Sequence, residues 1–419
     1  LSKFLVLIQN SSNMNQSGGK WAYYTTLTCD KYKCKLDEID FVSNLTSAMV
    51  DKLIPPEEIR TKKSIWVFED LGWFFDFNES ASLALKYYPT KTQFDGVIAF
   101  DINIFEKVFK NIDSIDFSVD EEKTIINENN VVEFLIDLTL FKNNKELALN
   151  SEKLSLFWNS FDRAFGKEYS NSNGIKNLMY MVYGSLGNKN IQLYSSKNII
   201  QSLKDLDYNN NLKTISKSEF FSLSKSNILD KVMDKNVNFK VNLKVDIDEE
   251  NNIKNVAVVS VSNTNPSKIR DQVISYFQFY LNKGSSLIST NFPSKMGASK
   301  NSTVDYEKHG FVTDKKIDTI NTKTAYLASD DVRVYEDGNF LIVGGWNISS
   351  SGQNKKIEID WKSNYKIEDG VYKLFVQKQP NVDYILSLEI SYPSNINGNN
   401  TINKSVNINE DKLIEIKID

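Results

Sequence analysis

Leu5-Val6-Leu7-Ile8 is a short apolar run that leads into Gln9-Asn10 and, after a polar stretch, into Ser17-Gly18-Gly19. Two more blocks follow within the first 101 residues. They are the set Trp66, Asp70, Trp73, Asp76 and Ala81, and the run Asp95-Gly-Val-Ile-Ala-Phe-Asp101. An apolar run of about four to eight residues bounded by turn residues is typical of a buried strand. The three blocks together predict an α/β domain whose glycines and aspartates lie at strand ends, where a site would lie.

The bulk composition is that of a folded protein. With 419 residues the chain has room for about two to three domains. Its 41% hydrophobic and 25% charged residues exclude disorder as the dominant state. The 50 basic and 54 acidic residues are spread along the chain without a basic stripe, so we do not expect a nucleic-acid partner.

Arginine and histidine are scarce, and this limits the chemistry. Arginine binds phosphates and carboxylates through two parallel hydrogen bonds, and a pocket of several arginines can hardly be built from four. These are Arg60, Arg163, Arg270 and Arg333. A codon bias toward lysine explains the same shortage. The single histidine, His309, excludes histidine-rich zinc sites and lies beside no nucleophile motif, so we interpret it as structural or incidental.

Cys29 and Cys34 are the only cysteines. The alternating residues before Cys29 and the polar residues between the two cysteines indicate a hairpin. Paired strands bring Cα atoms to the distance of about 5.5 Å that a disulfide needs. We therefore predict a Cys29–Cys34 disulfide and an extracytoplasmic location in the cell envelope or at the cell surface. Two reduced thiols remain the alternative.

The apolar pattern changes near residue 236. Before it, strands and helices alternate; after it, apolar residues alternate with polar ones in many short segments. Residues 1–235 are predicted to form an α/β domain with a mixed sheet flanked by helices, and residues 236–419 an all-β, immunoglobulin-like sandwich. The first half includes predicted strands at 3–8, 64–68 and 96–100, a helix over 79–88 capped by Asn78, and a helix from Ser151 to Gly166.

No run reaches the roughly 18 apolar residues of a membrane span. The chain starts with leucine rather than methionine, so the sequence leaves open whether a signal peptide or membrane anchor was removed from in front of residue 1. We expect contact with a membrane only through such an anchor outside the chain.

The order and spacing of the three N-terminal blocks resemble the bacterial domain of unknown function (DUF) family 4012. That family opens with an apolar strand, an Asn and a Gly-Gly turn, here at Asn10 and Gly18-Gly19. Its later blocks match Asp70 to Ala81 and Asp95 to Asp101, and residues 277–288 and 372–380 look like strands of its β domain. The resemblance implies the α/β core and extends over nearly the whole chain.

One departure from the family concerns its charged positions. Between Asn10 and the glycines the family usually carries an acidic residue, an arginine and a proline, where this chain has Asn13, Asn15 and Gln16. Glu69 stands where an arginine is usual. The family is also remotely similar, at the level of the fold, to the LytR-CpsA-Psr enzymes, which transfer glycopolymers from a polyprenyl carrier to the cell wall. Fold similarity alone is a weak argument for function.

The candidate site lies in the N-terminal blocks. Its candidate residues are Asp70, Asp76 and Asp101 for catalysis and Gly18, Gly19 and Lys20 for ligand binding. Grouped carboxylates could hold Mg²⁺ or Ca²⁺, whereas single ones would cap helices or turns. The glycines permit positive φ in a tight turn or a close approach to a ligand. The acidic run 246–250 lacks the glycine of an EF-hand loop and is interpreted as a solvated turn.

Two functions follow from these residues. The first is a non-catalytic binding or structural module of the cell envelope, without a cofactor, whose partners are wall polymer or other surface proteins. The alternative is a divalent-metal-dependent glycopolymer phosphotransferase of LytR-CpsA-Psr type with a degenerate site. That enzyme needs basic groups around Gly18-Gly19 to hold a pyrophosphate, and Lys20 is the only near candidate. The residues therefore favour a protein that is not an enzyme, and they leave the ligand and the oligomeric state open.

Overall fold

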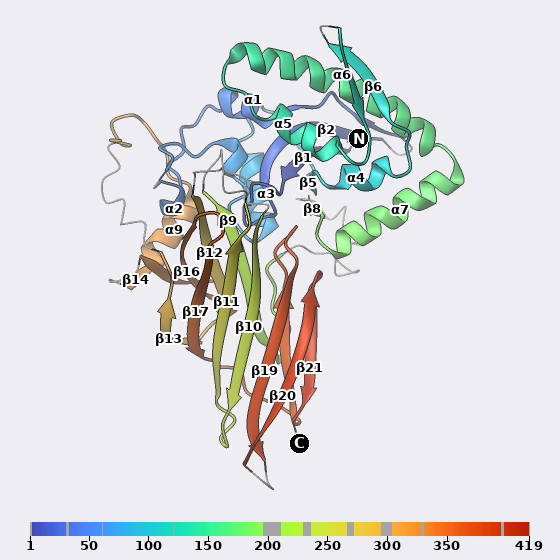
Figure 1. Ribbon diagram of the computed structural model, residues 1–419. Helices are drawn as coiled ribbons and strands as arrows, with labels where there is room; N and C mark the ends of the chain where they lie inside the picture. Colours follow the sequence, from blue (N-terminus) through green and yellow to red (C-terminus); the bar gives the residue numbers. More distant parts are fainter. Residues whose placement is uncertain are drawn as a thin grey trace. The chain divides into compact units, whose positions relative to one another are not determined.

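The computed structural model describes residues 2–30, 33–60, 62–119, 121–195, 211–228, 236–265, 272–294, 304–327, 331–394 and 398–418. Internal contacts divide the chain into two compact units (Figure 1). Unit 1 consists of Leu1–Ser11, Ser17–Val50 and Val67–Asn211, and unit 2 of Ser12–Gln16, Asp51–Trp66 and Leu212–Asp419. Among the described residues, no helix is long and apolar enough to span a bilayer.

Unit 1 is built on one mixed sheet. In spatial order its strands are β3 (Cys34–Leu36), β2 (Lys20–Cys29), β1 (Ser2–Asn10), β5 (Gly96–Asp101) and β8 (Ile191–Ser195), with β4 (Asp40–Phe41) also beside β2. Only β1 and β5 run parallel. Leu5 and Leu7 in β1 and Val97 and Ala99 in β5 are fully buried. The predicted buried strands at 3–8 and 96–100 are confirmed.

Helices and a hairpin complete unit 1. They are α1 (Val42–Ala48), the 3₁₀ helix η1 (Phe68–Asp70), α3 (Phe77–Lys86), α4 (Ile104–Phe109), hairpin β6 (Ile115–Val119) and β7 (Glu122–Ile126), α5 (Val131–Leu138), α6 (Asn144–Glu168) and α7 (Ser172–Gly187). Aromatic side chains join α4 to α6. The ring centroids of Phe105 and Phe161 lie 5.3 Å apart, and those of Phe109 and Phe161 lie 5.8 Å apart. These aromatic stripes form core, as the helical period of their residues predicts.

Three local predictions in the first half are wrong. Asp76 rather than Asn78 caps α3, because its carboxylate accepts the backbone N–H of Asn78. Helix α6 begins before Ser151, whose hydroxyl donates to the carbonyl of Leu147 inside the helix. Residues 64–68 form no strand: Trp66 makes only an isolated bridge with Leu53. In the first two cases several polar residues compete for one cap, and the sequence does not rank them. In the third, the apolar run leads directly into η1 at Phe68.

Unit 2 is a sandwich of two sheets. The first contains β13 (Ser286–Asn291), β17 (Asn354–Lys362), β11 (Ile253–Asn263), β10 (Val237–Ile247), β19 (Tyr384–Ser394) and β20 (Gly398–Ile408) in that order. The second contains β14 (Ala325–Leu327), β15 (Val332–Asp337), β16 (Phe340–Ser349), β12 (Val273–Asn282), β9 (Glu219–Asn227), β18 (Val371–Gln377) and β21 (Lys412–Lys417). Apolar side chains from both sheets share one core, and β10 alternates between buried and exposed residues as predicted.

The predicted fold class, an α/β part followed by a β-sandwich, is therefore confirmed. The described strands of the sandwich number thirteen, six in one sheet and seven in the other. Immunoglobulin domains have about seven to nine strands. The sandwich is therefore larger than the predicted immunoglobulin-like domain.

Unit 2 also includes two segments from the first half of the chain. In Ser12–Gln16, the side chain of Gln16 accepts the hydroxyl of Tyr280 at 2.6 Å, and Gln379 Nε2 donates to the carbonyl of Asn15 at 3.0 Å. In Asp51–Trp66, helix α2 (Glu57–Arg60) carries Glu58, which forms a buried ion pair with Arg333. These polar contacts tie both segments to the seven-stranded sheet.

The predicted domain boundary at 235/236 lies at the end of residues 229–235, which are outside the described residues. By contacts, the units divide at 211/212, one strand earlier. That strand is β9, a central strand of the seven-stranded sheet. Its mixed sequence, Glu-Phe-Phe-Ser-Leu-Ser-Lys-Ser-Asn, is buried throughout and gives no simple strand pattern.

Candidate functional site

The candidate site of unit 1 lies at the carboxyl ends of β1 and β5. Because these strands are parallel, Gln9 pairs with Asp101, and Asn10 follows at the same edge. Asp95 lies at the opposite edge, where its carboxylate accepts the backbone N–H of Lys3 at 2.9 Å. Ligands of open α/β sheets bind outside the carboxyl ends of parallel strands. Asp101 is therefore placed where a ligand would be expected, and Asp95 is not.

Gly18 and Gly19 satisfy a backbone requirement. Their φ angles are 111° and 146°, which L residues with a side chain rarely adopt. A Cβ on Gly19 would lie 2.8 Å from the carbonyl carbon and oxygen of Asn10. The predicted positive φ is confirmed, and the close approach that the structure shows is to the chain's own backbone.

Lys20 and Asp70 form an ion pair. Lys20 Nζ lies 3.4 Å from Asp70 Oδ1, and the two side chains are 9% and 2% exposed. A buried carboxylate and ammonium neutralise each other, and separating them would leave a costly charge. Lys20 is the candidate that the sequence offers near the glycines for binding an anion. Its charge is already engaged by Asp70.

Asp101 is the most perturbed acid of the site. Its Oδ1 accepts the backbone N–H of Asn103 at 2.8 Å, just before α4. Oδ2 is buried and has no hydrogen-bond partner. Burial raises the pKa of Asp101 to about 6, against the smaller lowering effect of the Ser11 and Asn103 groups. A carboxyl with a pKa near neutrality can hold or release a proton under physiological conditions.

The three candidate aspartates have separate roles. Asp76 caps α3, Asp70 pairs with Lys20, and Asp101 bonds to the turn before α4. Throughout the described parts of the chain, no three acidic, histidine or cysteine side chains come together as a metal-holding group. The structure therefore does not bring Asp70, Asp76 and Asp101 together around one ion.

A buried amide cluster holds the segment in front of the glycines. Gln192 Nε2 donates to the carbonyl of Ser17 at 2.7 Å and to Gln9 Oε1 at 3.2 Å, and Gln9 Nε2 donates to the same carbonyl at 2.9 Å. The Ser17 hydroxyl donates to the carbonyl of Gly72 at 2.9 Å. Gln9 and Ser17 belong to the first sequence block but had no predicted role, and Gln192 was not predicted to lie near them. The available signal was a glutamine at a buried strand position, first in β1 and again in β8.

Cys29 and Cys34 form a disulfide, as predicted. They are directly paired residues of β2 and β3, with Cα atoms 4.1 Å apart. Residues 31 and 32 of the hairpin are outside the described residues. The bond therefore fastens β3 to the edge of the sheet of unit 1.

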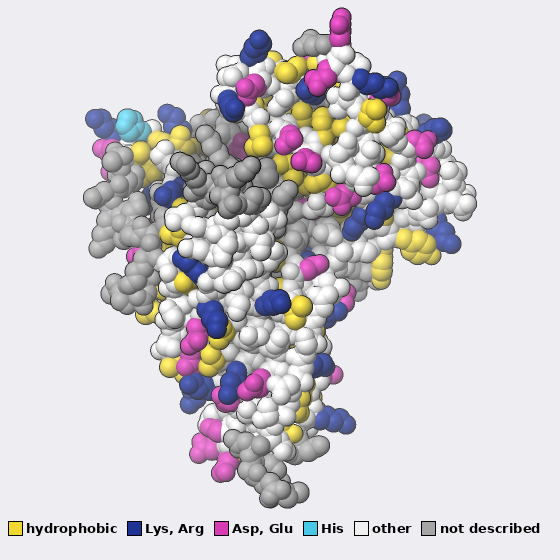
Figure 2. Space-filling view, viewed as in Figure 1, with side chains coloured by type: hydrophobic (Ala, Val, Ile, Leu, Met, Phe, Trp, Pro, Cys, Tyr) yellow, Lys and Arg dark blue, Asp and Glu magenta, His cyan; other side chains and the backbone are white. Residues whose placement is uncertain are grey.

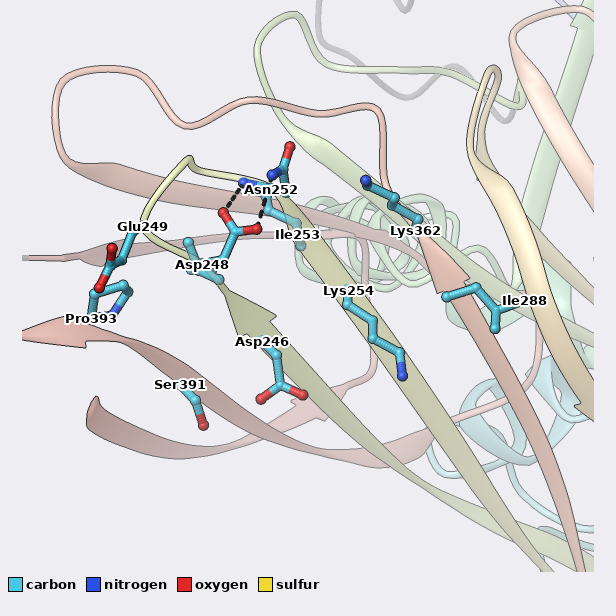
Figure 3. Close-up of a pocket in the computed structure, with 11 residues that line it drawn as sticks. Asp246, Asp248, Glu249, Asn252, Ile253, Lys254, Ile288, Lys362, Ser391 and Pro393 are labelled. Carbon is cyan, nitrogen blue, oxygen red and sulfur yellow. Dashed lines mark hydrogen bonds between the residues drawn. The ribbon is translucent and has the colours of Figure 1, made fainter. Parts of the chain in front are cut away.

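Unit 2 has a groove of about 540 Å³ on its six-stranded sheet (Figure 3). Its lining includes Asp246, Asp248, Lys254 and Lys362. Asp248 accepts the backbone N–H groups of Glu250 and Asn252 at 2.9 and 2.8 Å, which confirms the turn predicted for the acidic run. Lys254 pairs with Asp360 at 3.1 Å. Two of these four charged side chains, Asp248 and Lys254, are thus engaged with the turn and with a neighbouring strand.

Residues 2–138 match the family DUF4012, described as "Protein of unknown function". The predicted resemblance is confirmed over this DUF4012 region, which contains every candidate residue of the site. A comparison with curated proteins finds no match.

Two solved structures from Bacillus subtilis are similar to part of the chain. One is titled the transcriptional regulator yvhJ, with 13% identity, a TM-score of 0.25, and coverage of 52% of this chain and 84% of the other. The second is TagV, with 12% identity, a TM-score of 0.26, and coverage of 52% of this chain and 86% of the other. At such scores the likeness carries no argument about function.

Proposed function

We propose that this chain is a non-catalytic binding or structural module of the cell envelope or cell surface, acting outside the cytoplasm through contacts with wall polymer or other surface proteins. The observation that carries the proposal is that the candidate groups of the DUF4012 region are used internally. Lys20 neutralises Asp70, and Asp76 caps a helix. Lys20, the basic side chain next to the glycines in the sequence, is thereby already engaged instead of facing a pyrophosphate.

The positions of the arginines support the same proposal. Arg163 lies on α6, where its Nε donates to the carbonyl of Asn159. Arg60 and Arg333 belong to unit 2, and Arg270 is outside the described residues. Among its described residues, unit 1 therefore has one arginine, and that arginine does not lie at the carboxyl ends of β1 and β5.

The disulfide supports the extracytoplasmic location. Cys34 is exposed in a three-residue edge strand. Cytoplasmic thiol systems keep accessible cysteines reduced, whereas disulfides persist in secreted and surface proteins. Labelling of intact cells with a thiol reagent that cannot enter them tests this part: Cys29 and Cys34 should react only after a reductant is added.

One observation favours the alternative, a metal-dependent glycopolymer phosphotransferase. Asp101 is buried at the carboxyl ends of the parallel strands with a raised pKa and an unpartnered Oδ2. Perturbed acids of this kind concentrate at functional sites. Ion-pair and capping networks perturb acids as well, and the internal use of Lys20, Asp70 and Asp76 supports the non-catalytic function.

A paired assay tests the proposal. The purified chain is incubated with Mg²⁺, a polyprenyl-pyrophosphate-linked glycopolymer and insoluble cell wall, and both covalent transfer and reversible sedimentation with the wall are measured. We expect sedimentation without transfer, and unchanged sedimentation for Asp101→Asn. Transfer that is lost in Asp101→Asn would establish the phosphotransferase instead.

A further inference from the structure

Two buried oxygen atoms near the carboxyl ends of β1 and β5 have no hydrogen-bond donor among the described residues. They are Asp101 Oδ2 and Gln192 Oε1, and both side chains are fully buried. Buried polar atoms of folded proteins are nearly always hydrogen-bonded, so each exception needs a physical explanation. These two exceptions belong to the same part of unit 1 and share one explanation.

The strand register places the two side chains next to each other. Strands β1, β5 and β8 are neighbours in the sheet (Figure 1). Gln192 on β8 pairs with Ala99 on β5, and Asp101 lies two residues farther along β5 on the same face. The Gln192 side chain extends across β5, because its Nε2 donates to Gln9 Oε1 on β1 at 3.2 Å. Gln9 is the residue that pairs with Asp101, so the Gln192 amide lies beside the Asp101 carboxyl.

The orientation of the Gln192 amide follows from its partners. Its Nε2 donates to the carbonyl of Ser17 at 2.7 Å and to Gln9 Oε1, and only the N–H groups of an amide can do this. Oε1 is therefore the remaining atom, and it can only accept. An ionised carboxylate also only accepts, whereas a neutral carboxyl carries one O–H donor. A proton on Asp101 Oδ2 is thus the donor that satisfies both atoms.

We propose that Asp101 and Gln192 form a proton-dependent hydrogen bond, in which the neutral carboxyl donates from Oδ2 to Gln192 Oε1 and so fixes the segment in front of Gly18 and Gly19. Gln192 already holds the carbonyl of Ser17, so the added bond joins β5 to this segment through one amide. When Asp101 ionises, both oxygens stay buried without a donor, which is costly in an interior of low dielectric constant. The segment is therefore held firmly at acidic pH and loosened above neutral pH.

The environment of Asp101 sets the pH at which the bond is lost. Burial raises its pKa to about 6, and the largest opposing influences are the hydrogen bonds of Ser11 and Asn103. The neutral fraction of Asp101 consequently falls from about nine-tenths to about one-tenth between about pH 5 and pH 7. The change takes place within a range that an extracytoplasmic protein meets.

Neighbouring charges have less influence on Asp101 than burial and these hydrogen bonds. Figure 2 shows acidic and basic side chains mixed over the surface of unit 1 on that face, without a large area of one sign. The charged side chains on the elements around Asp101 are Lys3 of β1, Glu79 and Lys86 of α3, Glu106 and Lys107 of α4, and Lys189 in front of β8. The proton on Asp101 is therefore controlled mainly by its uncharged surroundings.

Crystal structures of the full chain at about pH 4 and about pH 8 test the contact directly. An O–H···O hydrogen bond has a distance of about 2.5–3.0 Å between its oxygens. We expect Asp101 Oδ2 and Gln192 Oε1 to lie at that distance at the lower pH and to be farther apart at the higher pH. A separation that is the same at both pH values would overturn the proposal.

Hydrogen exchange tests the effect on the segment. The Ser17 amide donates to the carbonyl of Gly72 at 3.2 Å, so its protection reports how firmly the segment is held. In wild type the protection, corrected for the intrinsic exchange rate, should fall about tenfold between about pH 5 and pH 7, in step with the neutral fraction of Asp101. Asp101→Asn keeps an N–H donor at every pH and should hold the protection constant.

Two glutamine variants separate the proposed bond from general loosening. Gln192→Met removes Oε1 and should abolish the pH dependence of Ser17 protection. Gln9→Met is the matched control, because it removes the other amide that donates to the Ser17 carbonyl but leaves Asp101 Oδ2 and Gln192 Oε1 in place. It should lower the protection and keep the fall of about tenfold. A pH dependence that persists in Gln192→Met would overturn the proposal.

Discussion

Replacement of Asp101 by asparagine should remove a large part of the pH dependence of unit 1. The carboxyl is fully buried, and its pKa is raised from 3.8 to about 6. A raised pKa means that burial penalises the ionised form, so the stability contributed by the neutral acid is fully present below about pH 4. It is lost as the pH rises through about 6. A shift of about two units corresponds to roughly 3 kcal/mol.

Hydrogen exchange of the amides in β1 and β5 measures this effect locally. The opening free energy of wild type minus that of Asp101→Asn should fall by about 3 kcal/mol between pH 4 and pH 8, because asparagine does not titrate. The side-chain amide that Asp101→Asn introduces changes stability by the same amount at every pH. Such a constant contribution does not affect how the difference between the two proteins varies with pH. Asp116 on β6 is the control, because its ion pair with Lys123 lowers its pKa, so its contribution is complete above about pH 4 and the difference between wild type and Asp116→Asn should stay nearly constant from pH 4 to pH 8. A difference for Asp101→Asn that stays constant with pH would refute the reasoning.

Three further substitutions test the fold. In a urea titration, Glu58→Gln should lower the free energy of unfolding of unit 2 by about 3–5 kcal/mol, because it leaves the buried Arg333 guanidinium without its charge partner. Glu389→Gln breaks the exposed ion pair with Lys244 and should lower that free energy by less than about 1 kcal/mol. In thermal unfolding, Gly19→Ala should destabilise unit 1 by about 2–4 kcal/mol, because its φ is positive and the added Cβ clashes with the backbone. The control Gly352→Ala also has a positive φ, but its Cβ meets no atom within 4 Å, so it should lower the free energy of unfolding by only about 1 kcal/mol. Lys404→Val should increase aggregation, measured by light scattering. Lys404 lies on the edge strand β20 and pairs with the buried Leu388 of β19. A charge on the inner face of an edge strand discourages pairing with further strands. Equal loss for the two members of either stability pair, or unchanged scattering for Lys404→Val, would contradict these expectations.

The sequence was sufficient wherever one local rule dominated. The apolar runs of β1 and β5 and the alternation in β10 correctly predicted buried strands, and the two glycines correctly predicted positive φ. The positions of Cys29 and Cys34 correctly predicted the disulfide. Each of these features depends on residues within one element or one hairpin.

Features that depend on distant partners could not be predicted. Lys20 on β2 forms an ion pair with Asp70 on η1, so the neutralisation of its charge cannot be derived from its neighbours in the sequence. The segment Asp51–Trp66 joins unit 2 through Glu58 and Arg333, which are 275 residues apart. Strand β9 is buried along its whole length, so neither a period of two nor a helical period marks it.

The hydrogen bond from Gln379 to Asn15 joins residues 364 positions apart within unit 2. A ribosome adds about 5–20 residues per second, so Asn15 waits for roughly 20–70 seconds before its partner exists. During that time the segment Ser12–Gln16 can only be held by other contacts or by a chaperone. Completion of the sandwich is therefore a late event in the synthesis of this chain, and truncation near the C-terminus would affect some of its first residues.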